Sequence, residues 1–202
     1  MEPGEPIKED RMEPNSAQNS TVGRFWDGLR EWLQVIVIAL VISLPIRFFI
    51  AEPFIVNGPS MDPTFSTGQF LIVDRLTYRF NEPQRGDVII FRYPNNPKVY
   101  YIKRIIGLPG EKLTIENGKV NITSSGTSTI LKEPYIAESH LSKESETITL
   151  DEKQYFVMGD NRIQSSDSRL WGPLDKKLII GRPIIRLFPL SSLSIFPGKY
   201  EL

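Results

Sequence analysis

Ser60 is the first residue whose setting suggests chemistry. It lies in "NGPSMDPTF" (57–65), between Pro59 and Pro63 and directly after an apolar run. Serine beside proline is commonest in turns. The stretch also lacks the G-x-S-x-G pattern of a nucleophile elbow, because Asp62 stands at the last glycine position. A catalytic Ser60 therefore requires a second residue that takes its proton.

Histidine is a poor candidate for that second residue. His140 is the only histidine, so a Ser-His-Asp triad would have to include it. It lies in the polar stretch "AESHLSKE", where we expect a solvated side chain. The chain has no cysteine, which excludes a thiol nucleophile, a disulfide and a cysteine metal site. If Ser60 is a nucleophile, we expect its base to be another residue type.

A lysine can act as the base if it is neutral. The pKa of an unperturbed lysine is about 10.4, and burial in apolar surroundings lowers it by roughly 3–5 units. The candidate must therefore lie on an apolar strand and face the core. Lys103 fits this requirement, because it lies in "VYYIKRIIGLPG" between aromatic and aliphatic neighbours, while most other lysines lie in polar segments. The segment alone is equally consistent with an edge-strand lysine that points to solvent.

A third segment, "MGDNRIQSSDSRLWG" (158–172), is dense in polar residues yet lies between apolar strands. Its charged side chains can pair with each other, and its amide and hydroxyl groups can bond to the backbone. The segment is consistent with a well-bonded structural loop. It is equally consistent with a set of groups that orients a catalytic side chain. The charged residues are Asp160, Arg162, Asp167 and Arg169, and the neutral ones are Asn161, Ser165, Ser166 and Ser168.

An apolar run precedes these segments. Residues 32–51, "WLQVIVIALVISLPIRFFIA", number twenty. As a helix they would extend about 30 Å, enough to cross a bilayer. A buried core helix is disfavoured because the run is apolar on all sides. A cleaved signal peptide is disfavoured because the run starts far from the N-terminus and no small-x-small site follows. We predict a membrane anchor at 22–51 after a disordered tail at 1–21.

The charges near this anchor predict its orientation. Arg24 and Arg30 precede the apolar run, whereas residues 52–66 carry no lysine or arginine. The positive-inside rule then places the tail in the cytoplasm and the rest of the chain outside. The overall net charge is zero, and no dense basic stripe indicates a nucleic-acid surface.

We predict a mainly β fold, in which a single N-terminal helix is followed by an antiparallel β domain at 52–202. Short runs rich in Val, Ile, Tyr and Phe alternate with Pro and Gly. Asn117-Gly118 between two such runs predicts a hairpin. Residues 121–153 are rich in Ser, Thr, Lys and Glu, so we expect an insertion or flexible loop within a variable insert at about 117–153. The expected strands lie in "FIVNG", "QFLIVD", "DVIIFR", "VYYIKRIIG", "KLTIENGKVNIT", "QYFVMG" and "LIIGRPIIRLF".

Four motifs in order carry a family resemblance: "EPFIVNGPSMDPT", "RGDVIIF", "YIKRIIGLPG" and "GDNRIQSSDSRLWG". Together, behind an anchor, they resemble the type I signal peptidase (leader peptidase) family of membrane-anchored Ser–Lys proteases. The resemblance covers roughly residues 30–190 and leaves the tail and the insert unmatched in detail.

The resemblance implies a role for each matching residue. Ser60 would attack the scissile carbonyl, and neutral Lys103 would take its proton and later protonate the leaving amine. Ser165 would hydrogen-bond and orient the Lys103 ammonium group. A supporting ion network near the site would comprise Arg104, Asp167 and Arg169. The turns at Gly86-Asp87 and at Gly159-Asp160-Asn161 would be scaffold around the site.

The resemblance also implies shallow apolar pockets for small side chains at the first and third positions before the cut. The same residues would serve equally as ordinary β core. Many family members carry a serine two residues before the nucleophile, where its hydroxyl helps to hold the oxyanion, but this chain has Gly58. The oxyanion would then rest on the Ser60 N–H, because Pro59 has no N–H. The expected pocket residues are Phe54, Val56, Met61, Phe65, Tyr101 and Ile102.

The implied function is a membrane-bound serine endopeptidase that removes N-terminal signal peptides from exported preproteins. Its partners would be signal peptides and the lipid bilayer of a bacterial-type plasma membrane, crossed once, with no cofactor, metal or nucleic acid. A self-cleaving regulator with a related Ser–Lys β domain is one alternative, but it would need a DNA-binding head and no membrane span. A catalytically inactive, anchored peptide-binding module is another, against which the presence of Ser60 and Lys103 argues.

Overall fold

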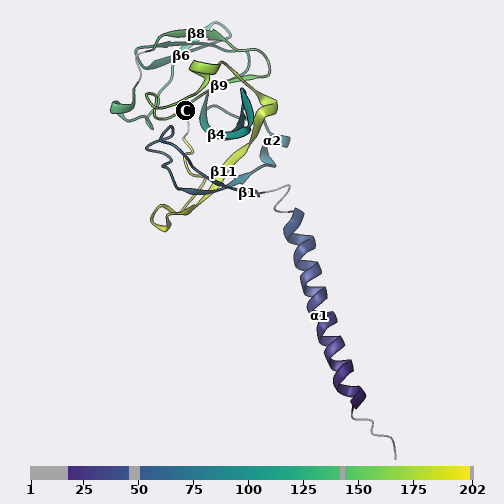
Figure 1. Ribbon diagram of the computed structural model, residues 1–202. Coiled ribbons are helices and arrows are strands. Elements are labelled where there is room, and N and C mark those ends of the chain that lie inside the picture. The colour runs from purple at the N-terminus through teal and green to yellow at the C-terminus, as the bar shows by residue number, and fades with distance from the viewer. Residues whose placement is uncertain (1–17, 46–50, 142–143, 201–202) are drawn as a thin grey trace, which may run out of the picture. The chain divides into compact units, whose positions relative to one another are not determined.

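The computed structural model describes residues 18–45, 51–141 and 144–200. The chain divides into two units, Met1–Pro45 and Ile46–Leu202. The first contains the helix α1 and the second contains the β domain (Figure 1). Each unit is described by itself below.

The helix α1 (Gln18–Pro45) exposes its apolar side chains from residue 35 to residue 44. No helix in the described ranges, α1 included, has the combination of length and hydropathy needed to cross a membrane. The predicted span 32–51 continues past α1 through residues 46–50, which lie outside the described residues. Ala51 corrects the predicted end of the anchor, because it begins strand β1 and pairs with Asp74. Of the tail expected at 1–21, residues 18–21 are helical and the others lie outside the described residues.

The β domain contains a larger sheet of eight strands in the order β1-β2-β11-β3-β4-β9-β10, with β12 paired to β11. Every pairing in it is antiparallel, so the predicted mainly antiparallel β fold is confirmed. The strands are β1 (Ala51–Ile55), β2 (Phe70–Asp74), β3 (Val88–Tyr93), β4 (Asn96–Gly107), β9 (Gln154–Met158), β10 (Leu174–Asp175), β11 (Ile179–Phe188) and β12 (Ser194–Ile195). Short helices connect them: α2 (Thr77–Phe80), α3 (Ser168–Trp171), η3 (Lys176–Leu178) and η4 (Leu190–Ser192).

A smaller four-stranded sheet in the order β7-β6-β5-β8 lies at the other end of the domain from β1 (Figure 1). Asn117 and Gly118 connect β5 to β6 with positive φ angles of 51° and 78°, as the hairpin prediction requires. The flexible loop expected at 121–153 instead contributes strands to this sheet, because its Thr and Ile residues pair with β5 and β6. The elements are β5 (Lys112–Glu116), β6 (Lys119–Ser124), β7 (Thr127–Ile130), β8 (Glu146–Thr149) and the turn η2 (Glu138–His140).

Strand β4 changes from exposed to buried along its length. Residues 96–100 are exposed, whereas residues 103–107 are buried between β3 and β9. Lys103 pairs with Ile89 of β3 at the point where burial begins. The alternation of side chains in a strand then places neighbouring residues on opposite faces of the sheet. Lys103 and Arg104 are consequently both buried, but in different surroundings.

Candidate active site

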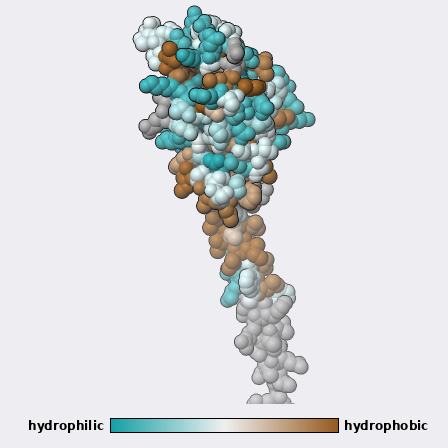
Figure 2. Space-filling model, turned by 90° about the vertical axis from the view of Figure 1, so that its left-hand side faces the viewer, coloured by the Kyte–Doolittle hydropathy of each residue, from teal (hydrophilic) through white to brown (hydrophobic). Residues whose placement is uncertain are grey.

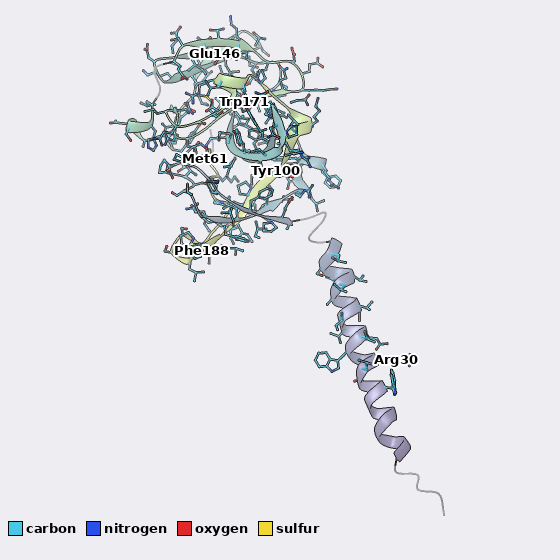
Figure 3. The ribbon with its side chains drawn as sticks, viewed as in Figure 1. Arg30, Met61, Tyr100, Glu146, Trp171 and Phe188 are labelled. Atoms are coloured by element: carbon cyan, nitrogen blue, oxygen red, sulfur yellow. The ribbon has the colours of Figure 1, made fainter. Side chains whose placement is uncertain are left out.

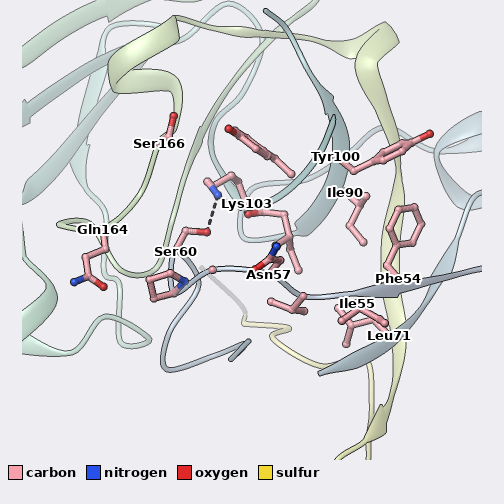
Figure 4. Close-up of a pocket in the computed structure, with 15 residues that line it drawn as sticks. Phe54, Ile55, Asn57, Ser60, Leu71, Ile90, Tyr100, Lys103, Gln164 and Ser166 are labelled. Carbon is pink, nitrogen blue, oxygen red and sulfur yellow. Dashed lines mark hydrogen bonds between the residues drawn. The ribbon is translucent and has the colours of Figure 1, made fainter. Parts of the chain in front are cut away.

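The structure brings Ser60 and Lys103 together although 43 residues separate them in the sequence. The Lys103 Nζ lies 2.7 Å from the Ser60 Oγ and 2.9 Å from the carbonyl oxygen of Ile102 (Figure 4). Only 3% of the Lys103 side chain is exposed, while Ser60 is half-buried. Of the two orientations that the sequence left open for Lys103, the structure shows the one that faces the interior.

Burial changes the acidity of this lysine. Loss of solvent lowers the pKa of Lys103 to about 8, although the negative charges of Asp167 and Asp160 act in the opposite direction. The ring of Tyr101 covers one side of the amine, with its centroid 5.1 Å from Nζ. At pH 7 a pKa of 8 leaves about one amine in ten neutral, roughly a hundred times the fraction for an exposed lysine. The amine can therefore accept a proton from its neighbour near neutral pH.

The loop that carries Ser60 is fixed by turn hydrogen bonds and by packing. The N–H of Asp62 donates to the Pro59 carbonyl, and the N–H of Phe65 donates to the Met61 carbonyl. Met61 and Phe65 are fully buried in a core cluster beneath the loop. Both were predicted to line a substrate pocket, and neither is among the residues that border the cavity beside Ser60.

That cavity has a volume of about 260 Å³ and opens beside the Ser60–Lys103 pair (Figure 4). Four of the predicted pocket residues line it, namely Phe54, Val56, Tyr101 and Ile102. The others could not be identified from the sequence, since residue type does not reveal which side chains border a cavity. These further lining residues include Ile55, Asn57, Leu71, Ile90, Tyr100 and Gln164.

Two buried ion pairs flank the site instead of the single network that the sequence predicted. The Arg104 guanidinium binds both oxygens of Asp160, at 2.8 and 2.7 Å, and both side chains are fully buried. Arg169 binds Asp167 in the same two-point manner. Burial alone would raise the pKa of Asp167, but the Arg169 guanidinium holds it below its usual range. Arg104 and Asp167 thus belong to separate pairs, because their side chains have different partners.

These pairs connect to the Ser60 loop. Asp160 accepts a hydrogen bond of 2.5 Å from the Thr64 hydroxyl, and the Asn161 N–H donates to the Ser60 carbonyl at 3.1 Å. Asp167 accepts from the Gly159 N–H at 3.0 Å. Thr64 was missed by the sequence analysis, because nothing in the sequence indicates a contact with a residue 96 positions away. The third segment is therefore hydrogen-bonded to the loop that carries Ser60.

Ser165 does not make its expected hydrogen bond to Lys103. The Ser165 hydroxyl is buried and helps to lower the pKa of Asp167, whereas Lys103 donates to Ser60 and Ile102. The Gly58 N–H donates to the Thr67 hydroxyl at 3.1 Å, so this N–H already has a partner.

The His140 side chain is not fully solvated, as the sequence had predicted it would be. It is half-buried, and its Nδ1 lies 3.2 Å from the carbonyl oxygen of Asp62, two residues beyond Ser60. The polar sequence around it concealed this contact, because the turn η2 folds back onto the nucleophile loop. The contact is to a backbone carbonyl, so His140 is not placed to take the proton of Ser60.

The sequence of this chain is similar to those of known proteins. The family described as "Signal peptidase, peptidase S26" matches residues 29–188. The chain belongs to this family. Signal peptidase family members are serine peptidases that cleave signal peptides from preproteins, so the chain is an enzyme of this class. This membership favours the peptidase over the self-cleaving regulator and the inactive binding module.

Individual signal peptidases resemble the chain over most of its length. The "Probable signal peptidase I-1" of Synechocystis is 38% identical, over 86% of this chain and 90% of the relative. The "Signal peptidase I" of Bacillus licheniformis is 37% identical, over 83% of this chain and 92% of the relative. A crystal structure of a signal peptidase I from Enterococcus faecalis is 32% identical and covers 50% of this chain and 97% of its own, with a TM-score of 0.43.

The burial of Lys103 predicts an effect on stability. The lowered pKa means that burial of the charged Lys103 amine destabilises the folded protein. This loss of stability is fully present below about pH 8. It disappears as the pH rises towards about 10.4, the pKa of lysine in the unfolded chain. Replacing the lysine by an apolar side chain of similar length, Lys103→Met, should therefore raise the free energy of unfolding at pH 7 by about 1–3 kcal/mol. Urea unfolding at pH 7 and at pH 10 measures the gain, which should shrink at the higher pH.

Lys98→Met is the matched control, because Lys98 is exposed on the same strand. It should leave the unfolding free energy unchanged at both pH values. A Lys103→Met protein that is less stable than the parent at pH 7 would contradict the account of the lowered pKa.

Proposed function

We propose that this chain is a membrane-bound serine endopeptidase that removes signal peptides from exported preproteins, with Ser60 as nucleophile and Lys103 as general base. The observation that carries the proposal is the 2.7 Å contact between a buried amine of lowered pKa and a serine hydroxyl at the edge of an open cavity. The position of the lone histidine supports it further, since His140 bonds a backbone carbonyl instead of Ser60.

The reaction would proceed in two stages. In the first, the neutral amine of Lys103 accepts the proton of Ser60 while Oγ attacks the scissile carbonyl, and the resulting ammonium group donates that proton to the leaving amine. The signal peptide is then held as an ester on Ser60. In the second stage Lys103 takes a proton from water, the water oxygen attacks the ester, and the proton returns to Ser60. The hydrogen bond from Nζ to the Ile102 carbonyl orients the amine throughout.

The groups around the pair would take supporting roles. Ser165 would turn its buried hydroxyl towards Lys103 when the amine is charged. The backbone N–H of Ser60 would hold the oxyanion, since Pro59 has no N–H and that of Gly58 is already bonded to Thr67. The two ion pairs would hold the surrounding loops in position. They comprise Arg104 with Asp160 and Arg169 with Asp167.

The substrate would bind with its apolar residues before the cut in the apolar part of the cavity. Phe54, Val56, Tyr101 and Ile102 border this part, and Phe54 packs edge-to-face on Tyr100 with ring centroids 5.4 Å apart. A cavity of about 260 Å³ that several large side chains border suits small apolar substrate side chains.

Membrane attachment would come from both units. Apolar side chains cover α1 from residue 35 to residue 44. This part belongs to the apolar run 32–50, which we propose anchors the chain with the tail in the cytoplasm and the β domain outside. In the β domain, the hairpin between β11 and β12 carries exposed apolar residues, with Phe188 at the end of β11 (Figure 3). Apolar side chains gather at the lower end of the β domain in Figure 2. Those of the hairpin are Leu187, Phe188, Leu190, Leu193 and Ile195.

The dyad predicts which single variants lose activity. Ser60→Ala and Lys103→Ala should each abolish cleavage of a preprotein in detergent micelles, because the nucleophile or its base is missing. Lys103→Arg should also be inactive, since arginine remains protonated. His140→Ala should retain cleavage, and it is the control for a residue near the loop. Turnover at the parental rate by either alanine variant of the dyad would refute the proposed mechanism.

The lowered pKa of Lys103 predicts the pH dependence of cleavage. The reaction requires the neutral amine, so kcat/KM should rise about tenfold per pH unit below about pH 8 and level off above it. Rates measured from pH 6 to pH 10 with one preprotein define this profile. A rise centred near pH 6.5, the ordinary histidine value, would indicate a different base.

The hairpin predicts a surface contact with lipid. Replacing Leu190, Leu193 and Ile195 together by serine should weaken binding of the β domain alone (51–202) to phospholipid vesicles, because these side chains are 60–78% exposed. Flotation with vesicles measures the bound fraction, and cleavage of a peptide free in solution should be unaffected. Serine at Ile130 is the control, since this residue is 61% exposed on β7 of the other sheet. Equal vesicle binding by parent and triple variant would contradict the contact.

A further inference from the structure

The cavity beside Ser60 has two chemically different sides. Phe54, Ile55, Leu71, Ile90 and Tyr100 lie together on one side of the Ser60–Lys103 pair in Figure 4. Gln164 and Ser166 lie on the other side in the same view. The pair that would cut the peptide thus lies between an apolar surface and a polar one. A bound peptide that passes Ser60 must contact both.

The loop that carries the polar side is firmly held. The Asn161 N–H donates to the Ser60 carbonyl, and the Asn161 side chain accepts from the Gln164 N–H at 3.2 Å. Arg162 bonds to the Gly159 carbonyl through Nε and to Glu133 through its other nitrogens. The loop therefore presents Gln164 and Ser166 from a backbone that is tied directly to the nucleophile, which favours a positioned contact with substrate.

Gln164 and Ser166 themselves retain free hydrogen-bonding groups. Both side chains are exposed. The Gln164 side-chain oxygen makes only a long contact of 3.5 Å with Asn161. Within the described ranges, neither the Gln164 amide nitrogen nor the Ser166 hydroxyl has a hydrogen-bond partner. An amide and a hydroxyl together can donate to peptide carbonyls and accept from peptide N–H groups.

The two sides fix the direction in which a peptide would bind. The residues before the cut are small and apolar in the proposed reaction, so they belong on the apolar side. The leaving amine must then lie on the opposite side, within reach of Lys103. We propose that Gln164 and Ser166 bind the first residues after the cut and so act as determinants of specificity for the start of the mature chain. This inference rests on the proposed function, because it assumes cleavage at Ser60.

The double variant Gln164→Ala/Ser166→Ala tests this assignment with two measurements on the full chain in detergent micelles. The first is kcat/KM for an intact preprotein, which has residues on both sides of the cut. The second is inhibition by the cleaved signal peptide, which ends at the cut. Loss of two neutral hydrogen bonds should lower kcat/KM by about fivefold to a hundredfold. The inhibition constant of the cleaved signal peptide should stay within about twofold, a change of under 0.5 kcal/mol.

Two outcomes would overturn the assignment. An unchanged kcat/KM would show that the two side chains do not contact the substrate. Weaker inhibition by the cleaved signal peptide, to the same extent as the loss in kcat/KM, would place them on the side before the cut. Both side chains are exposed, so the variant should fold, and its melting temperature checks this.

Two further variants complete the experiment. Ile163→Ala is the matched control, because Ile163 is 61% exposed on the same loop but does not line the cavity. It should change neither measurement. Ser60→Ala separates the two proposals: cleavage by that variant would refute the proposed function, whereas an inactive Ser60→Ala with an unaltered double variant would refute this inference alone.

Discussion

The site depends on one constraint, which is that the Lys103 amine must remain buried and yet be able to lose its proton. Burial alone favours the neutral form, but Asp160 and Asp167 lie near enough to oppose it. Each of these carboxylates is bound at two points by its own arginine. Because the arginines compensate the negative charges, the carboxylates can order the loops without holding the proton on Lys103. The two buried ion pairs are thus compatible with a lysine of lowered pKa.

The same polar groups determine where Ser60 lies. Its carbonyl is bonded to Asn161, Thr64 further along its loop is bonded to Asp160, and Asp62 is bonded to His140. These contacts come from two segments that are distant from the loop in the sequence, one at Asp160–Asn161 and one at His140. Beneath them, Met61 and Phe65 fill the core and prevent the loop from moving inward. The loop that carries Ser60 contains no regular strand, so packing and hydrogen bonds together determine its position. They keep the Ser60 hydroxyl at hydrogen-bonding distance from Lys103.

The sequence predicted the parts of the site that depend on residue type and local surroundings. Because Ser60 had no suitable histidine partner, a lysine on an apolar strand was the remaining candidate for its base. Asn117-Gly118 predicted the hairpin between β5 and β6, because its turn requires positive φ angles. The sequence could not predict which carboxylate each arginine binds, since this depends on tertiary contacts. It also could not separate Met61 and Phe65 from Phe54 and Val56, because cavity and core residues are equally apolar. The strands β7 and β8 were missed because they are rich in Ser and Thr and largely exposed.

Gly159 occupies the tightest point of this arrangement. A Cβ atom there would lie 2.3 Å from both the Ser60 carbonyl oxygen and the Ser165 hydroxyl. No side chain fits at this distance, so any larger residue must displace the Ser60 backbone or the Ser165 side chain. A substitution at residue 159 would therefore displace Ser60 and Ser165 first, and the hydrophobic core only after them. Selection for packing and selection for chemistry therefore act on the same residue, and a position without a side chain becomes one of the least replaceable in the chain.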